Sequence, residues 1–365
     1  MKKFKMITDI PKSQIVNSPL NNECTHFESN KFVYNYLCSD FIMDGKLFLP
    51  ISNKSMATST DVMGVFAKSK YLKYFSKDFT SFFKSNIDKF QIRTNCYVVG
   101  SSDNYYHCLL DFFPKLFGIN DHNLNKFDNI VLGKNYLKKS MMLETLLNKI
   151  KIKKKIIFLD EKTYFFNNSI MPFKSGLIQT INSYKKIFSN ELSNSPFRNI
   201  YISRLDSNNR VITNEKDLIN YLEKYNFEIY TLSNLNFLDQ IKLFNESKTI
   251  ISMHGAALSN LIFANKRTKV IEIAPNFNLN KQDDWFDNTK NIIGTNQGLV
   301  RNHFRLLSLK NGLNHYFYFS SMLDDETLKK YKSISKFDQI KKVTNGDLTL
   351  NIDLFSKFIE LQNLI

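Results

Sequence analysis

Short apolar runs alternate with amphipathic segments along the second half of the chain, and this alternation predicts its fold. The runs NIYIS at 199–203 and TIISM at 249–253 are rich in β-branched residues and bounded by polar ones, as buried parallel strands are. In all, we expect strands at 199–203, 227–230, 249–253 and 269–273 and helices at 215–225, 237–245 and 257–264. Strands and helices in strict alternation predict a Rossmann-like open sheet.

The first half shows the same rhythm less clearly. We expect strands at 96–100, 129–132 and 155–159 and helices at 104–113 and 134–149. Pro114 should stop or kink the first of these helices, because proline donates no backbone hydrogen bond. The remaining segments are strands at 31–37 and 46–49, helical or irregular structure at 61–75 and 79–90, and helices near 323–331 and 350–364. Between Pro275 and the last two helices, the polar sequence indicates loops.

A length of 365 residues suits two domains of ordinary size. A polar, proline-containing stretch at 188–197 marks the boundary between them. We therefore expect domains at 1–195 and 196–345, followed at 346–365 by a C-terminal helix that packs back on the first domain.

The composition narrows the choice of partners and compartment. Lysine and arginine number 50 and aspartate and glutamate 34, a formal charge of +16 that favours nucleic acid, anionic lipid or phosphorylated small molecules. An AT-rich genome would also explain the excess of lysine. The cysteines are scattered, which argues against a disulfide scaffold or a cysteine zinc site. Without a signal peptide or a long apolar run, we expect the protein to stay where it is made.

The segment 250–273 carries the clearest chemical signal. A buried strand ends at His254-Gly255, and small residues then open a short helix, where free backbone N–H groups and the helix dipole favour phosphate. Ser259 and Asn260 add side-chain donors, and Glu272 at the end of the next strand is placed to meet a ribose hydroxyl. The alternatives are a tight packing turn and, for Glu272, a solvated carboxylate.

Two further segments carry candidate residues. Arg204 ends the strand at 199–203, and Arg210 follows it; guanidinium groups suit phosphate, although solvated surface arginines are the alternative. In the predicted helix 104–113, His107 and Asp111 are four residues apart and therefore on one face. Such a pair can act as general base and orienter, or as a structural hydrogen-bonded pair.

Other signals are weaker. The acidic pairs at 283–284 and 324–325 resemble metal-binding pairs, but we interpret them as solvated, and we expect no metal. His122, His303 and His315 show no ligand spacing. The chain has neither a Walker A pattern nor GxGxxG, which counts against P-loop and classical dinucleotide chemistry.

In order along the chain, these segments resemble glycosyltransferase family 61 over about residues 91–275. The first motif is matched by His107, Asp111, Pro114 and Leu116. The second is matched by Ile202, Ser203, Arg204, Arg210, Asn214 and Glu215. The third is matched by His254, Gly255, Ala256, Ala257, Leu258, Ser259 and Asn260, and by Val270 to Glu272. The departures are Ala257 for glycine, Ser259 for threonine and Lys115 for the usual arginine.

The resemblance implies an α/β fold of the GT-B type, with two Rossmann-like domains facing a cleft. A nucleotide-sugar, most often a UDP-sugar, would bind as co-substrate to the second and third motifs and to Glu272, on the C-terminal domain. The acceptor, a glycan or lipid-linked glycan, would lie mainly on the N-terminal domain. Transfer would be inverting and independent of metal, with no cofactor. We favour Asp111 as the base and His107 as its partner, but the reverse assignment stays open.

The missing signal and membrane segments make the chain more similar to bacterial members that build capsule or lipopolysaccharide. We expect it in the cytoplasm, held peripherally at the anionic inner membrane face by its positive charge. Two other classes stay open: a basic nucleic-acid-binding protein, although no specific nucleic-acid motif is present, and a non-catalytic nucleotide- or carbohydrate-binding scaffold on the same fold.

Overall fold

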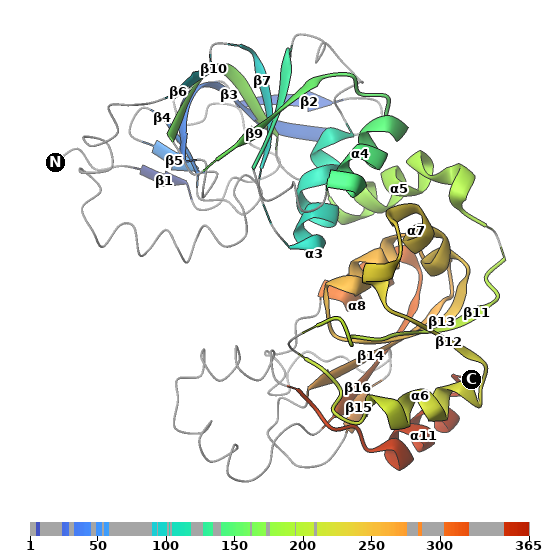
Figure 1. Ribbon diagram of the computed structural model, residues 1–365. Helices are drawn as coiled ribbons and strands as arrows, with labels where there is room; N and C mark the ends of the chain where they lie inside the picture. The colour runs from blue at the N-terminus through green and yellow to red at the C-terminus, as the bar shows by residue number, and fades with distance from the viewer. Residues whose placement is uncertain are drawn as a thin grey trace, which may run out of the picture. The chain divides into compact units, whose positions relative to one another are not determined.

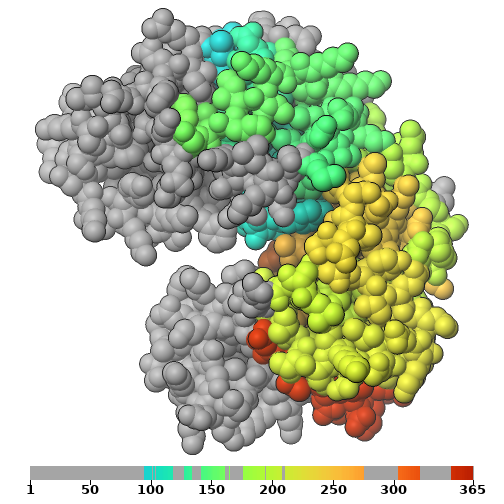
Figure 2. Space-filling model, viewed as in Figure 1, coloured from blue at the N-terminus to red at the C-terminus, as the bar shows by residue number. Residues whose placement is uncertain are grey.

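The chain forms two compact units, Met1–Ser183 and Tyr184–Ile365, which are described separately here. A computed structural model describes the side chains of the residues coloured in Figure 2 and the backbone of several further strands. The described ranges are 5–7, 24–28, 33–44, 49–52, 55–57, 90–92, 94–117 without 101 and 103, 127–133, 140–160, 163–172, 176–193, 195–207, 210–275, 284–286, 303–320 and 347–364.

The N-terminal unit is built on a mixed sheet of ten strands (Figure 1). Its strands are β1 Lys5–Ile7, β2 Cys24–Glu28, β3 Val33–Asp44, β4 Leu49–Ser52, β5 Ser55–Ala57, β6 Phe90–Ile92, β7 Cys96–Gly100, β8 Asn129–Gly133, β9 Lys155–Leu159 and β10 Thr163–Pro172. The main order is β1-β5-β4-β3-β10-β7-β8-β9, with β2 paired to β3 and β6 to β10. Strands β7, β8 and β9 are parallel, whereas the long strands β3 and β10 pair antiparallel.

The parallel part of this sheet confirms the strands expected at 96–100, 129–132 and 155–159. Strand β10 was not expected, because its alternation is interrupted by Asn167-Asn168, where the pairing with β3 shifts register. Strand β3 extends well beyond the expected 31–37, and β4 overlaps the expected 46–49 only at Leu49. Helix α4, Ser140–Lys149, is the described part of the expected 134–149. The segment 61–75 lies outside the described residues, as does 79–90 except for its last residue, which begins β6.

The helix expected at 104–113 is instead a run of three helical types. It consists of α3 Tyr105–His107, the π-helix η1 Cys108–Phe112 and the 3₁₀-helix η2 Phe113–Leu116. Asn104 begins it, accepting a hydrogen bond from the N–H of Tyr106. Pro114 cannot donate to the carbonyl of Leu110 and its ring would clash there, so the backbone widens before it and tightens after it.

The C-terminal unit contains a six-stranded sheet in the order β12-β11-β13-β14-β16-β15. Its strands are β11 Arg198–Ile202, β12 Phe227–Tyr230, β13 Ser247–Met253, β14 Lys269–Pro275, β15 Asp284–Phe286 and β16 Asn314–Ser320. All pairs are parallel except the edge pair β15–β16. Counted along the chain, the parallel strands have the doubly wound order 2-1-3-4-5, whose topological switch point lies between β11 and β13.

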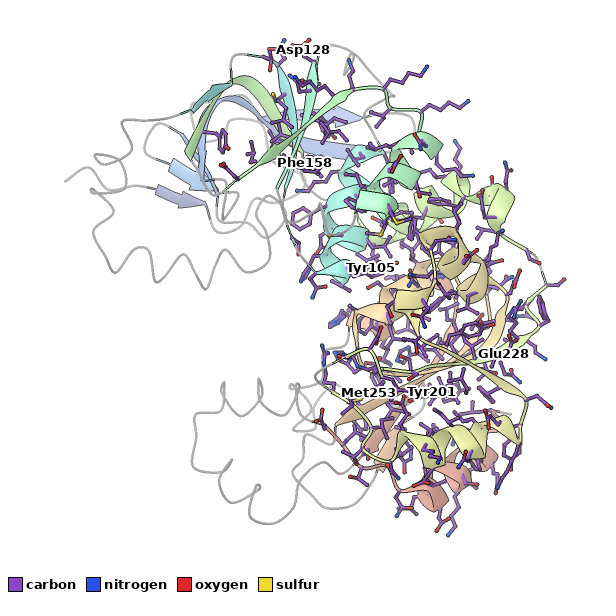
Figure 3. The ribbon with its side chains drawn as sticks, viewed as in Figure 1. Tyr105, Asp128, Phe158, Tyr201, Glu228 and Met253 are labelled. Atoms are coloured by element: carbon purple, nitrogen blue, oxygen red, sulfur yellow. The ribbon has the colours of Figure 1, made fainter. Side chains whose placement is uncertain are left out.

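Helices cover both faces of this sheet (Figure 1). One face carries α6 Glu215–Glu223 and α11 Ile352–Leu361; the other carries α7 Phe237–Asn245, the 3₁₀-helix η7 Ala256–Ile262 and α8 His303–Asn311. Tyr201 and Met253, on neighbouring strands, belong to the buried core on the α6 side (Figure 3). Alternation along the strands then directs the even-numbered residues of β13 and β14 toward α8.

The elements expected between 199 and 273 are confirmed, as is the helix near 350–364. The loop expected after Pro275 was wrong: α8 and β16 lie in that region, and β16 extends the parallel sheet next to β14. Gly312, at a φ of 77°, ends α8 and separates the two elements. The helix expected near 323–331 lies outside the described residues. The α/β class with parallel strands is therefore confirmed.

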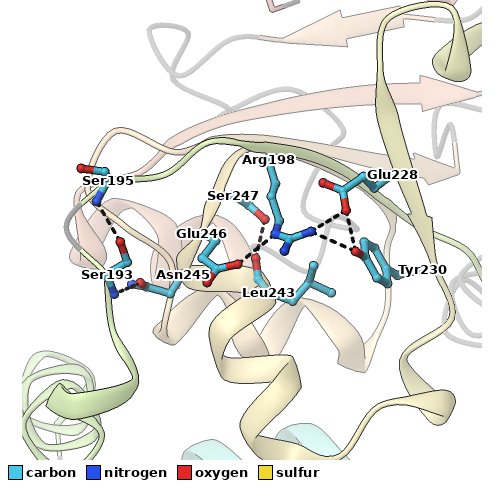
Figure 4. A network of polar contacts seen from close by, with 9 residues as sticks. All are labelled: Ser193, Ser195, Arg198, Glu228, Tyr230, Leu243, Asn245, Glu246 and Ser247. Carbon is cyan, nitrogen blue, oxygen red and sulfur yellow. Dashed lines mark hydrogen bonds and ion pairs between the residues drawn. The ribbon is translucent and has the colours of Figure 1, made fainter.

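A polar network at the amino edge of this sheet fixes the start of β11 (Figure 4). Arg198 donates from Nε to Glu246 at 2.8 Å and from Nη1 to Glu228 and Tyr230. Asn245 accepts from the N–H of Ser193 at 2.6 Å. The network holds β11 to β12 and to the turn between α7 and β13.

Candidate functional site

Two of the predicted segments meet at the carboxyl edge of the C-terminal sheet. β11 ends at Ile202 and β13 at Met253, and the two strands are paired in parallel, with Ile202 opposite Ser252. Arg204 therefore follows one strand and His254-Gly255 the other, on either side of the topological switch point. In open α/β sheets, ligands bind at this place.

Arg204 packs directly on the turn at Gly255. Its Nη1 would lie 2.2 Å from a Cβ added at Gly255, so only glycine leaves room for the guanidinium there. Arg204 also donates from Nε to the carbonyl of Arg210 at 3.1 Å and from Nη2 to Ser207 Oγ at 2.7 Å. Burial lowers the pKa of Arg204, opposed by nearby acidic groups, but an arginine stays charged in proteins. The glycine and the arginine thus form one structural unit.

Arg210 completes the link between the two segments. Its Nη1 donates to the carbonyl of His254 at 3.3 Å, while its own carbonyl accepts from Arg204. Its φ of 59° lies in the left-handed region, which is uncommon for a residue other than glycine. Two guanidinium groups therefore meet the backbone of His254-Gly255 at the switch point.

His254 is the first member of a buried polar chain. Its Nδ1 is hydrogen-bonded to Glu272 Oε1, and the second oxygen of Glu272 lies 3.0 Å from His315 Nε2. His315 Nδ1 is in turn 2.8 Å from Ser308 Oγ on α8. Glu272, His315 and Ser308 are all fully buried. We refer to these four residues as the histidine relay.

Glu272 stays ionised in this setting. Burial by itself raises its pKa, but electrostatic attraction to His254 and the hydrogen bonds from His254 and His315 outweigh burial and lower the pKa to about 2. Both carboxylate oxygens are engaged by histidines. This arrangement matches neither the contact with a ribose hydroxyl nor the solvated carboxylate considered from the sequence.

Sequence reasoning missed His315 and Ser308. His315 lies in β16, a strand we had assigned to loop, and is 43 residues from Glu272 in the sequence. The available signal was the aromatic run NHYFYFS at 314–320, which alternates toward the two faces of a strand.

Several predicted donor-binding residues have structural partners instead. Ser259 donates to the carbonyl of Ala256, Asn260 donates to Gln240, and both side chains are fully buried. Leu258 is a core residue, and Ser203 Oγ accepts from the N–H of Leu205 at 3.2 Å. These side chains shape the turn, and only its first alanines, Ala256 and Ala257, are partly exposed.

Asn214 also has a structural role. Its amide donates to the carbonyl of Leu350 at 2.9 Å and accepts from the N–H of the same residue at 2.9 Å. Each end of the side chain therefore makes a hydrogen bond to the C-terminal segment.

Glu215 is a buried carboxylate in the first turn of α6. Its Oε1 accepts from Tyr201 Oη at 2.6 Å and from the N–H of Arg204 at 3.3 Å. Burial and the Glu215 carboxylate raise the pKa of Tyr201 well above its ordinary value, so Tyr201 remains a donor. Glu215 Oε2 is buried and has no hydrogen-bond partner in the described part of the chain. A buried carboxylate oxygen in this condition suits a ligand N–H or O–H group.

The turn itself is less favourable to anions than the sequence predicts. The short helix expected at 257–264 is η7, a 3₁₀-helix of seven residues. A short 3₁₀ segment aligns few peptide dipoles, so its macrodipole is weak. The charged groups nearest to this turn are Arg204 and Arg210.

In the N-terminal unit, His107 and Asp111 form the predicted pair. His107 Nδ1 and Asp111 Oδ2 are 2.6 Å apart, and Asp111 is buried within the π-helix η1. Burial, followed by the charge of Asp111, raises the pKa of Tyr106 to about 12. Lys115, where an arginine is usual, is buried with its Nζ 5.0 Å from the centre of the Phe112 ring. π-Helical turns are frequent at functional sites, and this one bends the chain at Asp111.

Other kinds of site find no support in the described ranges. They contain no group of three or more histidine, cysteine, aspartate or glutamate side chains that could hold a metal ion. The side chains of the acidic pairs at 283–284 and 324–325 lie outside those ranges. No helix among the described residues is long and apolar enough to cross a membrane. A cavity of about 480 Å³ lies at the amino edge of the C-terminal sheet, beside Asn199, Lys248 and Lys269, and includes none of the site residues.

Comparison with known proteins agrees with this picture. Residues 105–271 match the family model described as Glycosyltransferase 61, a span that runs from the start of α3 to β14. It contains the His107–Asp111 pair and both segments of the switch point. No curated protein matches the chain.

Proposed function

Because the chain belongs to glycosyltransferase family 61 and is a glycosyltransferase, we propose that it transfers a sugar from a nucleotide-sugar, in the first instance a UDP-sugar, to a glycan acceptor. In this proposal, inversion occurs at the anomeric carbon and no metal is used. The observation that carries it is the convergence of Arg204, Arg210 and His254 at the switch point of the C-terminal sheet.

The diphosphate of the donor would lie against these three residues. Fixed cationic donors stabilise the charge that develops on a leaving diphosphate, which is the role a metal ion has in other enzymes. Gly255 supports this placement because it admits the Arg204 guanidinium to the turn. Glu215 Oε2 would accept from a hydroxyl or N–H of the nucleoside, since it is the buried acceptor nearest to this edge that lacks a partner in the described residues.

The acceptor hydroxyl would lose its proton to the His107–Asp111 pair. As that oxygen attacks the anomeric carbon, the bond from the carbon to the diphosphate breaks, and its electron pair stays on the leaving phosphate. Asp111 would take the proton, and His107 would hold the Asp111 carboxylate in position through the 2.6 Å contact. This assignment requires the GT-B arrangement, with both units facing one cleft, and that arrangement is part of the proposal.

The biological setting is proposed on the family resemblance and the charge of +16. A glycan or lipid-linked glycan acceptor of the capsule or lipopolysaccharide type would be met at the cytoplasmic face of an anionic membrane. Basic residues near such a surface add to its attraction.

Donor binding is the direct test. Thermal shift against UDP-, GDP-, CMP- and dTDP-sugars identifies the nucleotide, and calorimetry then gives its affinity. Arg204→Ala should keep the fold and weaken donor binding by roughly 10- to 150-fold, because a lost charge-assisted bond costs about 1.5–3 kcal/mol.

Arg198→Met is the matched control, since Arg198 begins the strand that Arg204 follows. It should leave donor affinity unchanged. If Arg204→Ala binds every nucleotide-sugar as wild type does, the donor site lies elsewhere. Binding without hydrolysis or transfer in wild type would support the non-catalytic scaffold instead.

A further inference from the structure

The histidine relay has a definite order, which the elements around it impose. Glu272 on β14 and His315 on β16 point to the same face of the sheet, toward α8, which supplies Ser308. His254 follows β13 on that face and reaches Glu272 with Nδ1. Three neighbouring strands and one helix therefore contribute to a single buried chain of hydrogen bonds.

The hydrogen bonds decide which ring nitrogens face which groups. An ionised carboxylate accepts and does not donate, so both His254 Nδ1 and His315 Nε2 donate to Glu272. His315 Nδ1 then meets the Ser308 hydroxyl, which can donate to it. Every polar atom of His315 and Glu272 is thus used.

His254 differs, because one of its nitrogens is left over. Its Nε2 has no hydrogen-bond partner in the described residues, although the side chain is only 9% exposed. With Nδ1 bonded to Glu272, Nε2 faces another side of the ring, and it is not among the fully enclosed side-chain atoms that lack a partner. His254 follows β13 at the carboxyl edge, where Arg210 contacts the His254 carbonyl.

We propose that Glu272 and His315 are positioning residues, which hold the His254 ring so that Nε2–H is presented to the leaving diphosphate. This inference rests on the proposed function. It assigns roles to Glu272 and to His315, which lie outside the matched family segment, 105–271. His254 would contact the phosphate, whereas Glu272 and His315 act through it.

Charge balance supports this direction. A buried carboxylate without a countercharge is costly, and an imidazolium beside it offsets part of that cost. Because Nδ1 donates to Glu272, Nε2 carries a hydrogen only when the His254 ring is protonated on both nitrogens, which the proposal requires in the complex with the diphosphate. The groups that face the His254 ring are Glu272, His303 at 5.4 Å between ring centres and Phe304 at 5.3 Å. Of these, only Glu272 contributes a negative charge.

The first measurement uses the free protein. Nitrogen-15 NMR of histidine side chains distinguishes Nδ1–H from Nε2–H forms in wild type, in His315→Leu and in Glu272→Gln. In wild type, His254 should carry a hydrogen-bonded Nδ1–H. In Glu272→Gln the contact with Nδ1 loses its charge, and in His315→Leu Glu272 loses its second donor, so the hydrogen-bonded Nδ1–H signal of His254 should shift or weaken in both variants. An unchanged His254 signature in both variants would overturn the proposal.

The second measurement uses UDP and calorimetry in buffers of different ionisation enthalpy. Wild type should take up a proton on binding UDP, and Glu272→Gln should lose that uptake and bind about tenfold more weakly, as expected for a lost charge-assisted contact. His315→Gln, which keeps a donor toward Glu272, should retain most of the affinity that His315→Leu loses.

Phe317→Leu is the control for simple loss of packing, because Phe317 lies on the same face of β16 and its ring centre is 4.8 Å from that of His315. It should lower the melting temperature without changing the His254 signature or the proton uptake. If Phe317→Leu changes the His254 signature and the proton uptake as much as His315→Leu does, the relay is only structural. If wild type binds no nucleotide, the proposed function fails, while the NMR of the free protein still decides the relay.

Discussion

At the scale of single residues, Gly255 is where a missing side chain has the clearest consequence. Its φ of −179° is ordinary extended backbone, so conformational freedom is not what requires glycine. What requires it is space, because Arg204 Nη1 occupies the place of a Cβ. We therefore expect Gly255→Ala to fold normally, because only the flexible end of Arg204 has to move. Donor affinity should fall by about tenfold or more, because the guanidinium is displaced.

A double-mutant cycle separates this effect from general damage. In an Arg204→Ala background, Gly255→Ala should cost no further affinity, because the group that it displaces is already absent. The same methyl group added by Gly176→Ala, where a Cβ would lie 3.2 Å from Gln179 Oε1, serves as the matched control. Additive losses in the cycle would contradict the placement of Arg204 on the turn.

Glu272 gives the protein a specific sensitivity to acid. Its pKa falls from an ordinary 4.5 to about 2 in the fold, so its stabilising effect is complete above pH 4.5 and is lost as pH falls from 4.5 toward 2. The full effect is about 3 kcal/mol at most. In the unfolded chain, histidines are protonated throughout the range from pH 4.5 to 2. Within the relay, the change in free energy of unfolding over this range therefore comes from Glu272.

Urea unfolding of wild type and Glu272→Gln at pH 7, 5 and 3.5 checks this expectation. The gap in free energy of unfolding between the two should be similar at pH 7 and 5 and smaller at pH 3.5. A gap that stays constant over the whole series would mean that Glu272 is not held ionised by its histidines.

Asp111 is the residue on which the proposed chemistry depends most. Asp111→Asn keeps its shape and removes its basicity, so turnover should fall by about 10²–10⁴-fold, the usual range for general acid–base catalysis. Donor affinity should stay near the wild-type value. Full turnover combined with a much lower melting temperature would show that the His107–Asp111 pair is structural. The reverse assignment, with His107 as the base, is tested by measuring turnover in His107→Gln.

At the scale of elements, the start of β11 is held by charge and not by apolar packing. Arg198 contacts Glu246 and Glu228, which raise its pKa through hydrogen bonds and charge, Glu246 first. Because these groups are partly exposed, we expect Arg198→Met to cost about 1–2 kcal/mol in unfolding free energy. Lys248→Met, an exposed lysine on β13, should change stability by less than about 0.5 kcal/mol. Equal losses in the two variants, measured in urea, would contradict the network in Figure 4.

How far the elements were predictable depended on how regular their patterns are. The strands β11 to β14 have β-branched runs and clear caps, and the sequence places all four. The strand β16 is aromatic instead and was missed, and β10 was missed because polar residues interrupt it. The three-part helical run at 105–116 could not be read from spacing, since Pro114 changes the hydrogen-bonding pattern on both sides.

The site was predictable to the extent that topology alone defines it. Arg204 and His254 follow strands that must be neighbours in this order of sheet, so their meeting follows from the pattern. The histidine relay does not follow from the pattern, because His315 lies on β16, which the sequence did not reveal, and Ser308 lies on α8. The structural roles of Asn214, Ser259 and Asn260 were equally hidden, because motif matching does not show whether a polar group is already satisfied.

At the scale of the whole molecule, the end of β16 and the chain before α11 are held together by hydrogen bonds. Ser320 Oγ at the end of β16 donates to the carbonyl of Thr349 at 3.0 Å, and Asn214 holds Leu350 from both sides. Both contacts join residues that the structure describes, and they belong to the same unit as Arg204 and His254. Sequence changes between Ser320 and Thr349 that spare these hydrogen bonds would therefore leave the sheet anchored to the C-terminal segment, and this strand end could vary in sequence without carrying the site with it.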